Sequence, residues 1–181
     1  MIIKRDYYLN KIIDKRENGR IKIITGIRRC GKSYLLFNLY QEYLLSQGIK
    51  EEQIISIALD EIDNLEYRNP FRLNEYIKEK TKNRNQMYYI FIDEIQLSES
   101  VSNPYIDSKE KNVTFVDVLL GLMKRNNVDI YVTGSNSKML SSDVLTQFRD
   151  RGNEIHVNPL SFAEVYDLYE NKESAFEIML P

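Results

Sequence analysis

Short apolar segments alternate along the chain with longer amphipathic segments. The apolar segments, which predict β-strands, cover residues 21–25, 54–59, 87–92, 129–133 and 154–157. Segment 87–92 is apolar throughout, as is typical of a central parallel strand that is buried on both faces. Strands that alternate with helices of about 10–15 residues predict a parallel sheet covered by helices, which is an α/β fold.

Helix signals fill the intervals between the predicted strands. Apolar residues repeat at helical spacing from residue 32 to residue 47, and Gly48 then supplies the left-handed residue that often ends a helix. Three further helix starts are predicted from capping residues, at Asn69-Pro70, at Thr114 and at Ser161, where Glu164 completes a capping box. The polar segment 98–112 contains Pro104 and shows no periodicity, so we expect a surface loop there.

The composition is that of one globular domain. Of the 181 residues, 43% are hydrophobic and 29% are charged, which argues against disorder. The longest apolar run, residues 87–92, is too short to cross a membrane. A single cysteine and a single histidine exclude an internal disulfide and a multi-histidine metal centre. We therefore expect a cytoplasmic protein with no membrane partner.

Basic residues are concentrated at the start of the chain. Residues 1–33 contain ten Lys or Arg and three acidic residues, whereas the rest of the chain contains 15 and 24. Such asymmetry indicates either an anionic partner near the basic end or a solvated helix surface.

Residues 26–33 read Gly-Ile-Arg-Arg-Cys-Gly-Lys-Ser and match the phosphate-loop (P-loop) pattern G-x-x-x-x-G-K-[ST]. The two glycines let the backbone approach a β-phosphate, and the loop N–H groups with the following helix surround the anion. Lys32 is expected to reach the β- and γ-phosphates and the Ser33 hydroxyl to bind Mg²⁺. The preceding strand and the following helix are the context that this motif requires. The predicted nucleotide-binding residues are Gly26, Arg29, Cys30, Gly31, Lys32, Ser33 and Tyr34.

An acidic pair follows the apolar segment 87–92. Asp93 is in the Walker-B position and is predicted to hold Mg²⁺ against the phosphates. Glu94 is predicted to act as the general base that activates the attacking water, while Lys32 stabilises the transferred phosphoryl group. The alternative is an acidic pair that merely solvates the end of a strand.

The fourth predicted strand ends in Thr133-Gly134-Ser135-Asn136. Asn136, with Ser135 as second choice, is predicted to orient the attacking water as a sensor residue. A plain turn is the alternative, because this composition is also turn chemistry.

Two arginines precede the fifth predicted strand. Arg149 and Arg151 are candidates for stabilising charge on the γ-phosphate, within the same chain or toward a neighbouring subunit. Equally, they could be surface arginines paired with Asp150 or Glu154.

Taken together, these motifs resemble a large family of prokaryotic AAA-type P-loop ATPases related to the AAA+ and STAND superfamilies. The matching segments are, in order, TGIRRCGKSYLL, YYIFIDEIQ, IYVTGSNSKMLSS, FRDRG and HVNPLSFAEV. The resemblance implies a three-layer αβα P-loop core with a parallel sheet of the additional-strand order 5-1-4-3-2, and ATP and Mg²⁺ as ligands. It also implies that Gln96 is a family-characteristic residue, that segment 98–112 is an insertion, and that residues 1–181 are the N-terminal core of a longer protein.

The sequence thus predicts a Mg²⁺-dependent ATP-binding protein or ATPase whose nucleotide state is relayed to a C-terminal domain or a protein partner, with a homo-oligomer as a further expectation. One alternative is a nucleic-acid-associated ATP switch of the helicase-loader type, in which the N-terminal basic cluster contacts nucleic acid. An isoelectric point near 5.6 argues against strong affinity for nucleic acid. A phosphotransferase acting on a small acceptor is the third reading.

Overall fold

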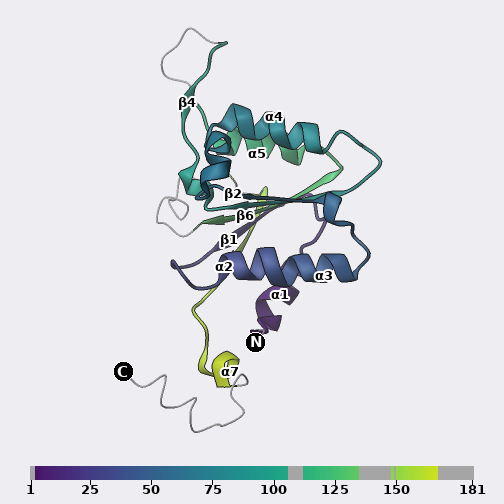
Figure 1. The fold of residues 1–181 in the computed structure, drawn as a ribbon, viewed down its shortest axis with the longest axis vertical. Helices are drawn as coiled ribbons and strands as arrows, with labels where there is room; N and C mark the ends of the chain where they lie inside the picture. Colours follow the sequence, from purple (N-terminus) through teal and green to yellow (C-terminus); the bar gives the residue numbers. More distant parts are fainter. Residues whose placement is uncertain (1–2, 106–111, 135–147, 149, 167–181) are drawn as a thin grey trace.

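A central parallel sheet lies between two layers of helices in the computed structural model (Figure 1), which describes residues 3–105, 112–134, 148 and 150–166. The strands of this sheet are β1 (Ile21–Thr25), β2 (Ile54–Ala58), β3 (Tyr88–Asp93), β6 (Val128–Gly134) and β7 (Gly152–His156). They lie in the order β2-β3-β6-β1-β7. If these five strands are numbered 1 to 5 in chain order, the order across the sheet from β7 to β2 is 5-1-4-3-2. The predicted α/β class is confirmed, and no strand end differs from the predicted one by more than two residues.

Helices cover both faces of the sheet (Figure 1). One face is covered by α4 (Pro70–Lys80) and α5 (Phe115–Met123). The other face is covered by α1 (Asp6–Ile13) and by a continuous helix made of α2 (Lys32–Tyr34), the π-helical segment η1 (Leu35–Tyr40) and α3 (Gln41–Ser46). The short helices are η2 (Glu51–Gln53), η3 (Ile62–Arg68), η4 (Ile95–Leu97) and α7 (Phe162–Tyr166).

The alternation of side chains along β3 explains its continuous apolar sequence. Ile90 and Ile92 are buried in the cluster that includes Leu73 of α4 and Leu119 of α5. Phe91, between them, is buried in the opposite cluster with residues of α1 and η1. Because both faces of the strand are covered, neither set of alternate positions can be polar.

The predicted helix starts are confirmed by their caps. The Asn69 side chain accepts a hydrogen bond from the Phe71 backbone at 2.9 Å. Thr114 forms a capping box with Asp117, and Ser161 forms one with Glu164. Gly48 has the left-handed conformation (φ +84°) expected after the first long helix.

Two elements differ from the sequence prediction. Helix α1 was not predicted, because it has eight residues and buries only Tyr8 and Ile12, too short a pattern to show a period. The segment predicted as a loop at 98–112 begins and ends in a small antiparallel ribbon, in which β4 (Val101–Ser102) pairs with β5 (Asn112–Val113). Strands of two residues leave no alternation to detect.

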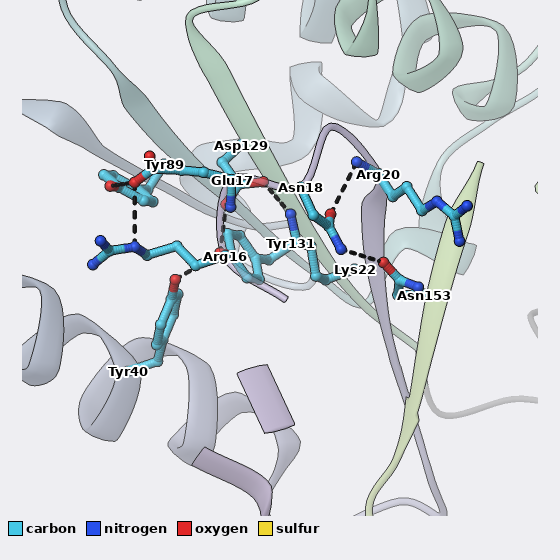
Figure 2. Close-up of polar contacts among 10 residues, drawn as sticks. All are labelled: Arg16, Glu17, Asn18, Arg20, Lys22, Tyr40, Tyr89, Asp129, Tyr131 and Asn153. Atoms are coloured by element: carbon cyan, nitrogen blue, oxygen red, sulfur yellow. Dashed lines mark hydrogen bonds and ion pairs between the residues drawn. The ribbon is translucent and has the colours of Figure 1, made fainter. Parts of the chain in front are cut away.

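A buried ion pair joins β1 to β6 at the edge of the sheet where both strands begin (Figure 2). The Lys22 ammonium contacts the Asp129 carboxylate, whose second oxygen accepts hydrogen bonds from Tyr131 Oη at 2.6 Å and from the Glu17 backbone at 2.8 Å. Tyr40 extends the network to η1 through Tyr131. Burial lowers the pKa of Lys22, and Asp129 opposes this shift. Removal of either side chain would therefore leave the other charge buried without a counter-ion.

We expect Lys22→Met to lower the free energy of unfolding by about 3–5 kcal/mol, because it leaves Asp129 buried without its counter-ion. Urea unfolding followed by circular dichroism measures this loss. The double variant Lys22→Met/Asp129→Asn removes both charges and should recover part of it. A loss of under about 1 kcal/mol in the single variant would contradict the assignment of a structural pair.

Candidate functional site

The loop of residues 26–33 connects β1 to α2 and bends at residues with positive φ. These are Gly26 (φ +146°), Arg29 (φ +66°) and Gly31 (φ +89°). A Cβ atom on Gly26 would lie 2.2 Å from the Val157 carbonyl oxygen, so the backbone of the segment after β7 occupies the space that a side chain needs. Glycine is thus required at position 26 for packing as well as for conformation.

Lys32 lies inside this loop. Its side chain is only 4% exposed, and its ammonium group donates hydrogen bonds to the carbonyl oxygens of Gly26 at 3.1 Å and Ile27 at 2.9 Å. Cys30 is also buried, with its sulfur 3.9 Å from the same ammonium. Arg28 and Arg29 are exposed on the outer side of the loop. The loop thus gathers a buried positive charge and two exposed ones.

Ser33 and Tyr34 follow in the first turn of the helix. Ser33 is exposed, which leaves its hydroxyl accessible for an oxygen-ligated cation. Tyr34 is half-buried and packs against the apolar cluster beneath β1, so packing accounts for this side chain.

Thr133 connects the acidic pair to the strand beside the loop. It lies on β6, which pairs with β1 on one side and with β3 on the other. Its hydroxyl donates to the Asp93 carboxylate, and its oxygen accepts the Glu94 backbone N–H at 3.1 Å. Asp93 is 7% exposed. The predicted Walker-B residues and the P-loop therefore share the edge at which the parallel strands end.

Glu94 has a constrained backbone and a held side chain. Its φ of +51° is in the left-handed region, which is uncommon for a residue with a side chain. Gln96 donates a side-chain hydrogen bond to the Glu94 carboxylate. This contact restrains the Glu94 carboxylate.

The residues at this edge fit a magnesium nucleotide. The loop has glycines where Cβ atoms would crowd its neighbours, and a buried ammonium group at its centre. A serine hydroxyl and an aspartate carboxylate, on different elements, are hard oxygen ligands of the kind that Mg²⁺ prefers. Such a site needs few protein ligands, because phosphates and water supply the others.

Of the remaining predicted site residues, the structure describes Arg151 alone. Asn136, Ser135 and Arg149 lie outside the described residues. Arg151 is exposed and precedes β7, where Gly152 pairs with Ile21 at the start of β1. This is roughly 16 Å from the loop, for five residues of strand at about 3.3 Å each. This distance from the loop of its own chain favours the second of the two predicted roles of Arg151, toward the γ-phosphate of a neighbouring subunit, which stays a prediction.

Two residues with direct contacts to the site were missed in the sequence. Thr133 was noted only as a strand end, although its position one strand from the loop follows from the predicted sheet order. Arg5 was counted only as one of the basic N-terminal residues, yet its guanidinium donates to the Cys30 carbonyl oxygen within the P-loop. No local pattern around Arg5 indicates this contact.

Residues 18–166 match the sequence model of the AAA domain family. An uncharacterised protein of Haemophilus influenzae is 33% identical over 163 residues, which are 90% of this chain and 37% of that protein. An uncharacterised protein of Methanocaldococcus jannaschii is 32% identical over 168 residues, or 90% of this chain and 32% of the relative. The chain thus spans about a third of the length of these relatives.

The fold is similar to solved structures of AAA-type proteins. C. elegans PCH-2 superimposes with a TM-score of 0.62 at 15% identity, covering 92% of this chain and 47% of that chain. The Aeropyrum pernix ORC2 protein superimposes with a TM-score of 0.59 at 13% identity, covering 97% and 52%. At such identities the likeness shows the fold. Among the described residues, none of the helices is both long and apolar enough to cross a membrane.

We expect Gly26→Ala to lower the free energy of unfolding by about 2–3 kcal/mol, because the new methyl group collides with the Val157 carbonyl. Gly121→Ala is the matched control, since it adds the same methyl group within α5 where no atom lies within 4 Å. It should raise stability by about 0.5–1 kcal/mol. Thermal unfolding of both variants measures the difference, and shifts of the same sign would contradict the close approach of the two segments.

Proposed function

Because the chain belongs to the AAA domain family, we propose that it binds ATP together with Mg²⁺ and hydrolyses the nucleotide at the edge formed by the P-loop, Asp93 and Glu94. The observation that carries this proposal is the hydrogen-bond connection of Asp93 and Glu94 through Thr133 on β6, the strand next to the one that leads into the loop. Support also comes from the ORC2 structure, which is described as ADPNP–ADP complexes.

In this proposal each residue has a distinct task. The loop N–H groups and Lys32 bind the β- and γ-phosphates, and Ser33 and Asp93 hold Mg²⁺. When bound by these residues, Mg²⁺ would neutralise charge that develops on the phosphate oxygens. Glu94 accepts a proton from water as the water oxygen attacks the γ-phosphorus and the bond to the bridging oxygen breaks, which releases ADP and phosphate.

The neighbours of the acidic pair hold it in position. Thr133 fixes Asp93 and the backbone of Glu94, while Gln96 holds the Glu94 carboxylate. Asn136 is proposed to orient the attacking water. Arg149 or Arg151 is proposed to stabilise the γ-phosphate of a neighbouring subunit.

The relatives are about three times longer than this chain, which supports a relay of the nucleotide state to further parts of the protein or to a partner. The helicase-loader alternative is less favoured. Of the ten basic residues that suggested contact with nucleic acid, Arg5, Lys22 and Lys32 are buried and paired internally. Seven of the ten are then left for such contact, and the isoelectric point near 5.6 argues against strong affinity for nucleic acid.

Lys32→Ala should abolish binding of MgATP, whereas Glu94→Gln should keep binding and lower the hydrolysis rate by at least about 100-fold, the usual worth of a general base. Calorimetry and phosphate release measure the two quantities. The matched controls are Lys78→Ala and Glu99→Gln, which change exposed residues of the same types and should leave both quantities unchanged. Normal hydrolysis by the Glu94→Gln variant would refute the assigned base.

Cys30 is the single cysteine of the chain and lies within the loop, so its reactivity reports on phosphate binding. MgATP should slow its alkylation by iodoacetamide, because the bound phosphates close the loop around the thiol. The same nucleotide should give no protection in the Lys32→Ala variant. Equal alkylation rates with and without MgATP in the wild-type protein would contradict nucleotide binding in this loop.

A further inference from the structure

The guanidinium group of Arg5 joins segments that are distant in the sequence. It donates hydrogen bonds to the Cys30 carbonyl oxygen in the P-loop at 2.5 Å and to the Asn158 carbonyl oxygen after β7 at 2.8 Å. It also forms an ion pair with Glu164 of α7 at 2.9 Å, and its charge lies 4.6 Å from the centre of the Tyr8 ring. Arg5 is only 1% exposed, so one buried cation connects the start of the chain, the loop and its last described helix.

The contact with Cys30 fixes a peptide unit of the loop. A peptide unit is planar and trans, so its carbonyl and the next N–H point in opposite directions. When the Cys30 carbonyl accepts from Arg5, the Gly31 N–H is directed away from Arg5. Gly31 is left-handed, and a Cβ atom there would lie 3.3 Å from the Arg5 guanidinium. The N–H groups of a P-loop are its phosphate donors, so Arg5 sets the direction of one of them.

Glu164 ties this contact to α7. Its carboxylate pairs with Arg5 and also accepts the backbone N–H and hydroxyl of Ser161, which cap the helix. Although partial burial opposes ionisation, the hydrogen bonds from Ser161 and Arg5 lower the pKa of Glu164. The carboxylate is therefore ionised at neutral pH. Among the described residues, it is the only acidic group in an ion pair with Arg5.

The backbone between β7 and α7 also contacts the start of the P-loop and helix α1. The Val157 N–H donates to the Thr25 carbonyl at 2.8 Å, and the Val157 carbonyl is the atom that approaches Gly26. The Asn158 N–H donates to the Tyr8 hydroxyl at 3.2 Å. In Figure 1, α7 lies on the same side of the sheet as α1, close to the start of the chain. Arg5 and this segment therefore contact both ends of the loop.

We propose that Arg5 is a positioning residue of the P-loop, and that the Arg5–Glu164 ion pair couples the position of α7 to the affinity of the loop for nucleotide. Displacement of α7 removes the anion that balances a buried cation. An unbalanced buried charge is unfavourable, so Arg5 must then rearrange and release the Cys30 carbonyl. The inference rests on the proposed function, because it takes this loop as the phosphate site.

The alkylation rate of Cys30 without nucleotide tests the positioning directly. Glu164→Gln should raise this rate about tenfold, because it weakens a charge-assisted hydrogen bond that holds the loop. Glu17→Gln is the matched control. Like Glu164→Gln, this change removes a carboxylate that pairs with an arginine. Glu17 pairs with Arg16 and accepts a hydrogen bond from Tyr89, at the opposite edge of the sheet. The control should leave the rate within about twofold of wild type while thermal unfolding records any loss of stability. Equal acceleration in both variants would mean that general destabilisation exposes the thiol.

A double variant tests whether Glu164 acts through Arg5. Arg5→Gln alone should accelerate alkylation at least as much as Glu164→Gln. In the Arg5→Gln background, the Glu164→Gln change should have no further effect, because the group that it acts through is absent. Arg5→Lys should recover part of the slow rate, since a lysine keeps the charge but not the geometry of a guanidinium. If the two changes instead accelerated alkylation independently, so that their effects multiplied in the double variant, the proposed coupling would be overturned.

Measurements of MgATP binding distinguish a failure of this inference from a failure of the proposed function. Glu164→Gln should weaken MgATP binding about tenfold, corresponding to the loss of one charge-assisted contact, and leave the hydrolysis rate at saturating MgATP unchanged. No binding of MgATP by the wild-type protein would overturn the proposed function, and the alkylation rates would still decide the positioning. Normal MgATP binding with an unchanged alkylation rate in Glu164→Gln would overturn only the inference.

Discussion

The functional edge of this protein depends on the insertion of β6 between β1 and β3. All three strands are parallel, so the loop after β1 and the acidic pair after β3 emerge at the same edge. One strand of separation is too far for direct contact between the two sets of residues along the sheet, since neighbouring strands are about 4.8 Å apart. Thr133 lies on the strand between them and forms hydrogen bonds with both Asp93 and Glu94.

The buried lysines at the two edges of the sheet have different kinds of partner. At the edge where the strands begin, the Lys22–Asp129 pair and its tyrosines satisfy one another within the interior. At the edge where they end, the hydrogen-bond partners of Lys32 among the described residues are two loop carbonyls and the Cys30 sulfur, and none of them is a carboxylate. A buried cation with neutral partners favours an anion, whereas a cation paired with a carboxylate does not.

The sequence was sufficient for the strands of the sheet, because strands buried on both faces are mostly apolar, as in residues 88–92. The position of the loop of residues 26–33 near Asp93 and Glu94 was also predictable, since each follows a parallel strand and such strands end at the same edge. Arg5 could not be found in this way, because its burial depends on partners near residues 30, 158 and 164. For Arg151, the sheet topology alone already favours a role toward a neighbouring subunit over one within the same chain. In a parallel sheet, a residue that precedes a strand must lie at the edge opposite to the one where the P-loop lies.

The central claim is that the loop of residues 26–33 holds the phosphates of a magnesium nucleotide. The most direct measurement is a crystal structure of the chain with Mg²⁺ and a non-hydrolysable ATP analogue. The account predicts a β-phosphate enclosed by the loop backbone and in contact with Lys32, with Mg²⁺ bound to the Ser33 hydroxyl on the side of Asp93. A loop without phosphate at saturating analogue, or an analogue bound elsewhere on the protein, would contradict it.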